Sequence, residues 1–303
     1  MKVSICGCGW LGLPLAKFLV AKGLEVYGSK TRADSASRLL QYGIHGIALT
    51  IPFANTVDEN AFDDKNKRDH QSARQLSKLT DLNKSTELTK FFQTDVLVIN
   101  VPPRRKTMSG NEYVEAIVSL SDAAKKASCQ RVIFVSTTSV YGGLTGEVLE
   151  TSIPQPDTES GLAHFNIEQR LRESWGDDLV VLRLAGLIGP DRHPVKFLAG
   201  REGLAGGEEP VNLVHLDDCI QAIGSIIHQQ PALKVLHLAA TSHPTRKQYY
   251  TAMASRAGLS KPIFTAGSAM GGKIINADNS CRVLGIMLQH DDLMVHSPEI
   301  DCH

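Results

Sequence analysis

The sequence predicts an α/β fold, in which a doubly wound parallel sheet is covered by helices and a small C-terminal lobe is attached. The first residues read as a strand, a glycine-rich loop, a helix and a second strand. Short apolar runs then alternate with helical patterns, which is typical of parallel strands joined by crossover helices. With 303 residues, 42% of them hydrophobic, the chain is also long enough to bury a large core.

Residues 2–28 are expected to form the first β-α-β unit. An apolar run that begins at Lys2 predicts the first strand, and apolar residues at helical spacing after position 11 predict a helix. Pro14 falls in the first turn of this helix, where its missing N–H costs little. Gly23 stands where helices commonly end on a glycine, and residues 24–28 are the predicted second strand.

The loop of this unit has the G-x-G-x-x-G sequence Gly7-Cys8-Gly9-Trp10-Leu11-Gly12. Gly7 allows a tight turn, Gly9 allows a pyrophosphate to approach the backbone, and Gly12 allows the helix to pack closely on the sheet. Free N–H groups at the start of the helix then face the anion. Because the loop follows a strand and opens a helix, it predicts a dinucleotide site that includes Trp10 and Leu11. The alternative is a glycine-rich turn without a ligand.

The end of the second strand indicates which dinucleotide binds. An NAD site has Asp or Glu about 20 residues after the first glycine, where it binds the ribose 2′-hydroxyl. Here the chain reads Ser29-Lys30-Thr31-Arg32, with two cations, two hydroxyls and no carboxylate. Lys and Arg suit a 2′-phosphate, so we predict that NADP(H) is preferred over NAD(H). The alternative is that Lys30 and Arg32 are solvated surface charges.

Composition limits the other functions and the compartment. The 32 basic residues balance the 32 acidic ones, which argues against a nucleic-acid surface as the main role. No apolar run reaches the 18 residues of a membrane span, and the chain starts with a strand rather than a signal peptide. The six cysteines show no Cys-x-x-Cys spacing and the eleven histidines do not cluster. We therefore expect a cytoplasmic protein with reduced thiols and no metal site.

The rest of the chain continues the alternation of strands and helices. Residues 55–84 are polar and charged, and they predict a surface insertion. Val101 and Pro102 end a strand that is expected to lie beside the cofactor. Helices are predicted at 33–43, 87–92 and 112–127, and the later strands at 44–51, 95–101, 131–136, 180–184 and 235–238.

Three sequence blocks resemble those of the short-chain dehydrogenase/reductase superfamily, in its extended, epimerase/dehydratase-like form. They are Val135-Ser136-Thr137-Thr138-Ser139-Val140-Tyr141-Gly142, Arg183-Leu184-Ala185-Gly186-Leu187-Ile188-Gly189-Pro190 and Asn212-Leu213-Val214-His215-Leu216-Asp217-Asp218. The resemblance implies a Rossmann sheet that binds NAD(P) within residues 1–185, to which strands near 211–238 return. Residues 186–303 would then form mainly the substrate lobe. His215 with Asp217 and Asp218 could suggest a metal site, but the resemblance implies that this block is structural.

The resemblance further implies a catalytic hydroxyl and a Tyr-x-x-x-Lys pair. Thr137 matches the hydroxyl that polarises the substrate oxygen, but Ser160 and His164 stand where Tyr and Lys are expected. A serine cannot replace the tyrosine, because an aliphatic hydroxyl is far less acidic. Ser160 and His164 lie four residues apart on a predicted helix, so His164 is a candidate acid/base with Ser160 or Thr137 orienting the substrate. Alternatively, His164 binds the ribose or lies on a helix surface.

Other residues bear on the reaction and the substrate. Thr138 and Ser139 stand where dehydratases of the superfamily carry carboxylates, so elimination of water is not expected. Tyr141 is interpreted as structural, with proton donation as the alternative. Two groups of cations suit an anionic substrate such as a phosphate, or are solvated loop charges: Arg104, Arg105 and Lys106, and Arg192, His193, Lys196 and Arg201.

The sequence thus predicts an atypical NADP(H)-binding oxidoreductase or epimerase-like enzyme that acts on a small molecule. The alternative is a non-catalytic NADP(H)-binding redox sensor or regulatory protein. The glycine loop fits both, the missing tyrosine favours the sensor, and Thr137 favours the enzyme. No nucleic-acid or membrane partner is expected, and a homodimer through the helices at 112–127 and 165–175 is a further hypothesis.

Overall fold

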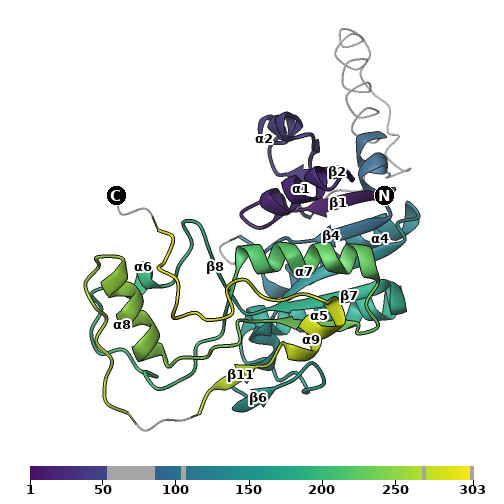
Figure 1. Cartoon of the computed structure of the whole chain (residues 1–303). Helices are drawn as coiled ribbons and strands as arrows, with labels where there is room; N and C mark the ends of the chain where they lie inside the picture. Colours follow the sequence, from purple (N-terminus) through teal and green to yellow (C-terminus); the bar gives the residue numbers. More distant parts are fainter. Residues whose placement is uncertain (53–85, 104–106, 268–270, 301–303) are drawn as a thin grey trace, which may run out of the picture. The chain divides into compact units, whose positions relative to one another are not determined.

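The computed structural model describes residues 1–52, 86–103, 107–267 and 271–300 (Figure 1). The insertion predicted at 55–84 and the cations Arg104, Arg105 and Lys106 lie outside these residues. The chain divides into two compact units, Met1–Val132 and Ile133–His303. The domain boundary predicted after residue 185 stays a prediction. Within the described residues, four of the sheet strands lie in the first unit, and three lie wholly or mostly in the second.

The four strands of the first unit run in the order β4-β1-β2-β3, and all their pairings are parallel. From β1 the chain adds β2 and β3 on one side and then returns to place β4 on the other. In doubly wound sheets a ligand binds beyond the carboxyl ends of the strands where the order reverses in this way. The glycine loop leaves β1 at this point. The strands are β1 (Lys2–Cys6), β2 (Glu25–Lys30), β3 (His45–Ala48) and β4 (Val96–Ile99).

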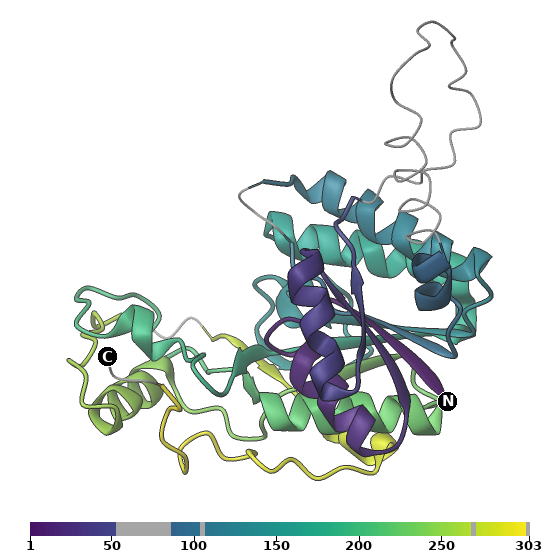
Figure 2. The same cartoon turned by 90° about the horizontal axis from the view of Figure 1, so that it is seen from above.

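Three helices of the first unit follow their predicted positions closely. Helix α1 (Gly12–Ala21), purple in Figure 2, packs on β1 and β2. It ends before Gly23, whose φ of 81° confirms the predicted glycine stop. Residues 86–92 are helical. Helix α4 (Gly110–Lys126) begins at a capping box, in which Ser109 and Glu112 each bond the other's backbone N–H.

The helix predicted after Arg32 forms in two shorter pieces. Helix α2 (Ala33–Ser37) continues as the 3₁₀ helix η1 (Arg38–Tyr42), which ends at Gly43 in the left-handed conformation. The close approach of α2 to β3 requires a glycine. A Cβ atom at Gly46 would lie 1.9 Å from the carbonyl oxygen of Ala36. Sequence periodicity does not reveal this contact, because it joins two elements rather than residues of one helix.

The second unit holds the sheet strands in the order β10-β7-β5, together with two separate strand pairs. All six residues of β7 are buried, as in parallel strands covered on both faces. The strands predicted at 180–184 and 235–238 are confirmed. The sheet strands are β5 (Arg131–Thr137), β7 (Leu179–Leu184) and β10 (Val235–Leu238), and the pairs are β6 (Gly146–Val148) with β11 (Lys273–Ile275) and β8 (Gly186–Ile188) with β9 (Leu213–His215).

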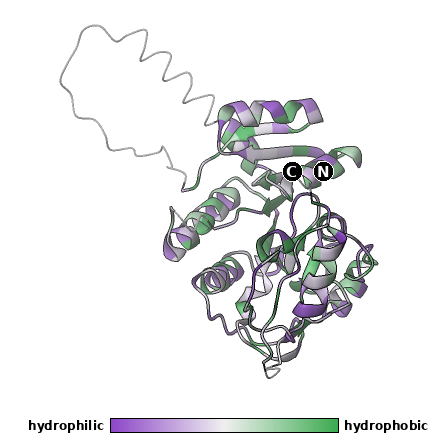
Figure 3. Cartoon of the chain, turned by 90° about the vertical axis from the view of Figure 1, so that its left-hand side faces the viewer, coloured by the Kyte–Doolittle hydropathy of each residue, from purple (hydrophilic) through white to green (hydrophobic). Residues whose placement is uncertain are grey.

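The helices of the second unit include α7, which is strongly amphipathic, with Ile220, Ile223 and Ile227 among its buried residues. The helical ribbons in Figure 3 carry both hydrophobic and hydrophilic colour, as expected of helices with one buried face. None of the helices in the described ranges is long and apolar enough to cross a membrane. The helical elements are η2 (Thr138–Tyr141), α5 (Glu159–Trp175), η3 (Gly176–Asp178), α6 (Val195–Leu198), α7 (Leu216–Gln229), α8 (Arg246–Arg256) and α9 (Asp278–Leu284).

The predicted substrate lobe has an apolar core of its own. Helices α6 and α8 contact each other there, and Leu293 joins them from the C-terminal segment. Tyr249 and Met253 of α8 are almost fully buried in this core. The lobe therefore forms a packed body around α6 and α8 rather than an extended loop.

Candidate functional site

The three glycines of the loop differ in what surrounds them. Gly7 has a φ of 98°, and a Cβ atom there would lie 2.4 Å from the carbonyl oxygen of Asn100. A Cβ atom at Gly12 would lie 2.2 Å from the carbonyl oxygen of Gly7. At Gly9, by contrast, no atom comes within 4 Å of that position. Backbone packing thus requires Gly7 and Gly12, whereas Gly9 leaves open space where the sequence predicts a pyrophosphate.

Ser29 supports the loop from β2. Its Oγ accepts a hydrogen bond from the Gly7 N–H at 2.9 Å and donates to the Sγ atom of Cys6 at 3.7 Å. The Cys8 N–H also donates to the Ser29 carbonyl oxygen, at 2.9 Å. Ser29 is buried, so the structure places it as a positioning residue for the loop. Its direct contact with a cofactor stays a prediction.

The basic residues after β2 are more accessible. Arg32 is 76% exposed, and its Nε and Nη2 atoms donate to the two carboxylate oxygens of Asp34, each at 3.0 Å. These hydrogen bonds lower the pKa of Asp34. Lys30 is half-buried and Thr31 is exposed. Sequence analysis missed Asp34, because it lies beyond the position where an acidic residue marks an NAD site.

The end of β4 is held from both sides. The Tyr113 hydroxyl of α4 donates to the Val101 carbonyl oxygen at 2.6 Å, and Asn100 Nδ2 donates to the Gly7 carbonyl oxygen at 3.4 Å. Val101 is half-buried and Pro102 is exposed. Two residues that the sequence did not single out therefore fix this edge. The Tyr113 contact spans 12 residues and has no spacing signal.

Cys6, at the end of β1, and Cys8, in the loop, are both buried. Burial raises the pKa of the Cys6 thiol to about 12, and it also raises that of Cys8 to about 12. Both side chains therefore stay protonated near neutral pH. They pack against the loop and are not candidate nucleophiles.

In the second unit, α5 packs closely on η2. A Cβ atom at Gly161 would lie 2.7 Å from the Ser139 carbonyl oxygen, so this contact requires the glycine. Thr158 caps α5 by accepting a hydrogen bond from the Gly161 N–H at 3.1 Å. This contact brings the strand end with Thr137 toward the first turn of α5, which carries Ser160.

The three predicted catalytic residues already have hydrogen-bonding partners or packing within the chain. Thr137 Oγ1 donates to Ser139 Oγ at 3.0 Å and accepts from the Ser139 N–H at 3.1 Å. His164 is buried, and its ring stacks on Phe134 with centroids 6.0 Å apart. Nδ1 of His164 donates to the Ser160 carbonyl oxygen at 2.7 Å. Because a carbonyl only accepts, the neutral ring carries its proton on Nδ1 and its lone pair on Nε2.

A buried polar network lies deeper on α5. Arg183 of β7 donates to both carboxylate oxygens of Glu168, with the shortest contact 2.6 Å, and to the Tyr141 hydroxyl at 2.6 Å. Ser136 Oγ donates to the same carboxylate at 2.5 Å. Tyr141 has no exposed surface, and burial raises its pKa. This placement supports the structural interpretation of Tyr141.

His237 extends the network from β10. Its Nε2 atom lies 2.5 Å from the Tyr141 hydroxyl, and its Nδ1 atom donates to the Asn276 carbonyl oxygen at 3.0 Å. In this tautomer, Nε2 accepts a hydrogen bond from the Tyr141 hydroxyl. Burial lowers the pKa of His237 to about 4, which keeps it neutral at physiological pH.

The cations predicted for the lobe have separate environments. His193 is buried between the Tyr249 hydroxyl, 2.8 Å from Nε2, and the Val195 N–H, which donates to Nδ1 at 3.2 Å. Burial lowers its pKa to about 4, so it carries no charge at neutral pH. The Nζ atom of Lys196 lies 4.0 Å from Oδ1 of Asp191. Arg192 and Arg201 are both exposed, and partial desolvation lowers the pKa of Arg192.

Similarity to known proteins agrees with the fold and the loop. Residues 5–222 match the NAD dependent epimerase/dehydratase family. The chain belongs to this family. Protein YeeZ of Escherichia coli K12 is 36% identical over 295 residues, which cover 97% of this chain and 98% of that protein. The predicted resemblance to the extended, epimerase/dehydratase-like superfamily branch is confirmed.

Two solved structures of similar architecture are enzymes bound to NAD. UDP-glucuronic acid 4-epimerase from Bacillus cereus, in complex with NAD, superposes with a TM-score of 0.69 at 17% identity, covering 97% of this chain and 95% of that one. The Bordetella bronchiseptica enzyme WbmG, in complex with NAD, has a TM-score of 0.69 at 17% identity, with 97% and 90% covered. At these identities the similarity establishes the Rossmann-like α/β fold of this epimerase/dehydratase family member.

Proposed function

We propose that this member of the epimerase/dehydratase family is an NADP(H)-dependent oxidoreductase or epimerase-like enzyme that acts on a small molecule. The open space at Gly9 carries the proposal, because it lies in a loop whose other two glycines are filled by backbone contacts. A phosphate group needs this close approach to backbone N–H groups. The NAD complexes of two proteins with the same fold support a nicotinamide dinucleotide as the cofactor.

The choice of NADP(H) rests on the residues after β2. Arg32 is exposed and pairs with Asp34 only through its Nε and Nη2 atoms. An exposed ion pair of this kind contributes little stability, so a 2′-phosphate can compete with Asp34 for the guanidinium. Lys30 adds a second positive charge at the same strand end.

Proton transfer is assigned to His164 and substrate orientation to Thr137 and Ser160. When bound, the dinucleotide supplies hydride transfer. The bond from Nδ1 to the Ser160 carbonyl oxygen fixes the ring and its tautomer, and the proposed proton transfer is assigned to the other ring nitrogen, Nε2. Thr137 can redirect its hydroxyl from Ser139 toward a substrate oxygen at the cost of one 3.0 Å hydrogen bond.

A second candidate function is a non-catalytic NADP(H)-binding sensor. The observation that favours it is the burial of His164, together with its hydrogen bond to the backbone of its own helix. A histidine in such surroundings stabilises α5 without any role in chemistry. The glycine loop would serve this function equally well.

The deciding experiment is a fluorescence titration of the purified protein with NADPH and NADH, followed by turnover with a panel of carbonyl compounds. The enzyme proposal expects tight NADPH binding and NADPH oxidation by the natural protein. If the natural protein binds NADPH without turnover, and the variant Ser160→Tyr/His164→Lys gains turnover, the result would instead support the sensor. No binding of either nucleotide would reject both functions.

Matched variants test the nucleotide preference separately. Arg32→Asp is expected to weaken NADPH binding while leaving NADH binding nearly unchanged, because only NADPH carries the 2′-phosphate. Asp34→Asn releases the guanidinium and is expected to strengthen NADPH binding by a few-fold at most. Equal binding of NADH and NADPH, or an unchanged NADPH affinity in Arg32→Asp, would contradict the predicted preference. The homodimer also stays a prediction, and a sedimentation mass of one chain would reject it.

A further inference from the structure

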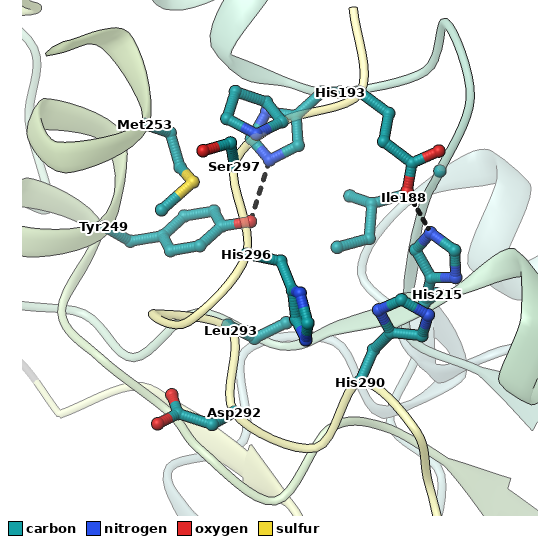
Figure 4. Close-up of a pocket in the computed structure, with 13 residues that line it drawn as sticks. Ile188, His193, His215, Tyr249, Met253, His290, Asp292, Leu293, His296 and Ser297 are labelled. Atoms are coloured by element: carbon teal, nitrogen blue, oxygen red, sulfur yellow. Dashed lines mark hydrogen bonds and ion pairs between the residues drawn. The ribbon is translucent and has the colours of Figure 1, made fainter. Parts of the chain in front are cut away.

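A group of histidines and carboxylates gathers in the second unit, formed by residues that the proposed reaction does not use. His215 ends β9, and His290 comes from the C-terminal segment after α9. Their rings stack with centroids 3.6 Å apart, and the His296 ring lies 4.9 Å from that of His290 (Figure 4). These rings line a cavity of about 30 Å³ together with Glu299.

The carboxylate of Asp217 faces both stacked rings. Its Oδ2 atom lies 3.4 Å from His215 Nδ1 and 3.3 Å from His290 Nε2. Both separations are longer than the usual ~2.7–3.2 Å of an N–H···O hydrogen bond. They match the ligand-to-ligand spacing of about 3.3–3.4 Å that tetrahedral geometry gives for zinc bonds of about 2.0–2.1 Å. One donor atom from each of the three residues lies within 4.8 Å of the others.

Neighbouring carboxylates position these donors. Glu299 Oε1 lies 3.0 Å from His215 Nε2, so Nε2 carries the proton and the Nδ1 lone pair points the other way. A carboxylate bonded to the far nitrogen of a histidine is the usual support of a metal-binding imidazole. Asp218 is buried and accepts hydrogen bonds from the Gln289 N–H at 2.7 Å and the His290 N–H at 3.2 Å. It thereby fixes the backbone that carries His290.

We propose that His215, Asp217 and His290 bind a divalent transition-metal ion, with Zn²⁺ as the ion to test. Two imidazoles and one carboxylate form a donor set that zinc accepts, with water as the fourth ligand. The adjoining cavity of about 30 Å³ is large enough to admit a water molecule. The metal replaces the 3.2 Å hydrogen bond that the Asp217 N–H donates to His215 Nδ1.

The proposed ion would connect two distant parts of the second unit. His215 and Asp217 lie where β9 passes into α7. His290 lies 73 residues after Asp217 in the sequence. Rotation of the His290 ring, which is more exposed than that of His215, is the adjustment that closes the site. Metal binding is therefore expected to stabilise the attachment of the C-terminal segment, and it does not depend on the proposed dinucleotide function.

The test is calorimetric titration of the chelator-stripped full chain with ZnCl₂, with Co²⁺ absorption as a second measurement. We expect one ion per chain, tetrahedral Co²⁺ bands and a higher thermal midpoint with Zn²⁺, because the ion binds only the folded chain. His290→Ala and Asp217→Asn each remove a ligand, and both are expected to abolish the Co²⁺ bands. Glu299→Gln removes only the support of His215 and is expected to weaken Zn²⁺ binding about 10–100-fold.

The matched control is His228→Ala, which removes an exposed histidine from the same helix α7. It should bind Zn²⁺ as the natural protein does. Circular dichroism and the metal-free thermal midpoint establish that each variant folds. Absence of one-to-one binding, or equal Zn²⁺ affinity in the natural protein, His290→Ala and Asp217→Asn, would overturn the proposal. Such equal affinity would assign Asp217 and His215 only to capping α7.

Discussion

The glycine loop and the first turn of α5 are built in opposite ways. In the loop, backbone contacts fill the positions around Gly7 and Gly12 but leave the space at Gly9 open. At α5, the His164 ring is buried and bonded to its own helix, and the Thr137 hydroxyl is bonded to Ser139. The loop is thus preorganised for a ligand, whereas the catalytic candidates must exchange existing contacts. From this contrast we expect that substitutions can separate the proposed nucleotide binding from the proposed proton transfer.

The sharpest test of this comparison is His164→Asn. An asparagine reproduces the Nδ1 donor that bonds the Ser160 carbonyl oxygen but removes Nε2. If Nε2 transfers the proton, kcat is expected to fall about 10²–10⁴-fold, with NADPH affinity unchanged. Steady-state kinetics and the NADPH titration measure the two effects. An unchanged kcat would assign His164 to helix structure alone.

Removal of one partner from the buried network should affect α5 more than the loop. In Arg183→Met, Glu168 keeps Ser136 but loses its cationic partner. Loss of one member of a buried pair is expected to lower the free energy of unfolding by about 3–5 kcal/mol. Chemical denaturation measures this change. Arg183→Met/Glu168→Leu removes the stranded charge and should recover part of the loss, and no recovery would contradict the explanation.

Acid is expected to lower the stability of the second unit through His237. Burial lowers its pKa from the ordinary 6.5 to about 4, so its contribution is complete above pH 6.5. As the pH falls from 6.5 to 4, the unfolded chain takes up a proton that the folded chain does not. Stability should therefore decrease by up to about 3 kcal/mol for this group. His193 has the same pKa direction and adds to the effect.

Denaturation curves between pH 7 and pH 4 test the contribution of His237. His237→Gln retains hydrogen-bonding groups but does not titrate, so its stability should depend less on pH than that of the natural protein. An identical pH slope in the two proteins would exclude His237 as a source of the acid sensitivity.

Of two single substitutions compared in the loop, Gly9→Ala should have the smaller effect on stability. Gly9→Ala places a Cβ atom in open space, so the thermal midpoint should not change, but NADPH affinity should fall by about tenfold or more because the phosphate loses close access. Gly12→Ala collides with the backbone of Gly7 and should lower the midpoint as well. If Gly9→Ala bound NADPH with unchanged affinity, the open space at Gly9 would no longer support the proposed function.

Local signals in the sequence account for most of the fold. The glycine spacing predicts the turn, the close helix packing and the open phosphate position, and Gly23 predicts the end of α1. These features depend on residues near one another in the chain, where spacing carries information. The same holds for β7 and β10, whose apolar runs indicate burial.

The contacts that sequence analysis missed join distant residues. Tyr113 reaches the end of β4 across 12 residues, and His290 meets Asp217 across 73 residues. Side-chain direction and burial decide such meetings, and neither has a spacing rule. Ser29 shows the limit most clearly: the sequence predicts it at the end of the second strand as a cofactor-binding residue, but it does not reveal its burial or its bond to Gly7.

The burial of Cys6 and Cys8 has a consequence for how this protein experiences oxidants. Burial raises the pKa of each thiol to about 12, so the thiolate form is scarce at pH 7. Peroxides and disulfides react with the thiolate, so Cys6 at the end of β1 and Cys8 in the loop should react slowly with oxidants. A sensor built on this loop would therefore respond to the ratio of reduced to oxidised nucleotide, and not to oxidation of its own cysteines.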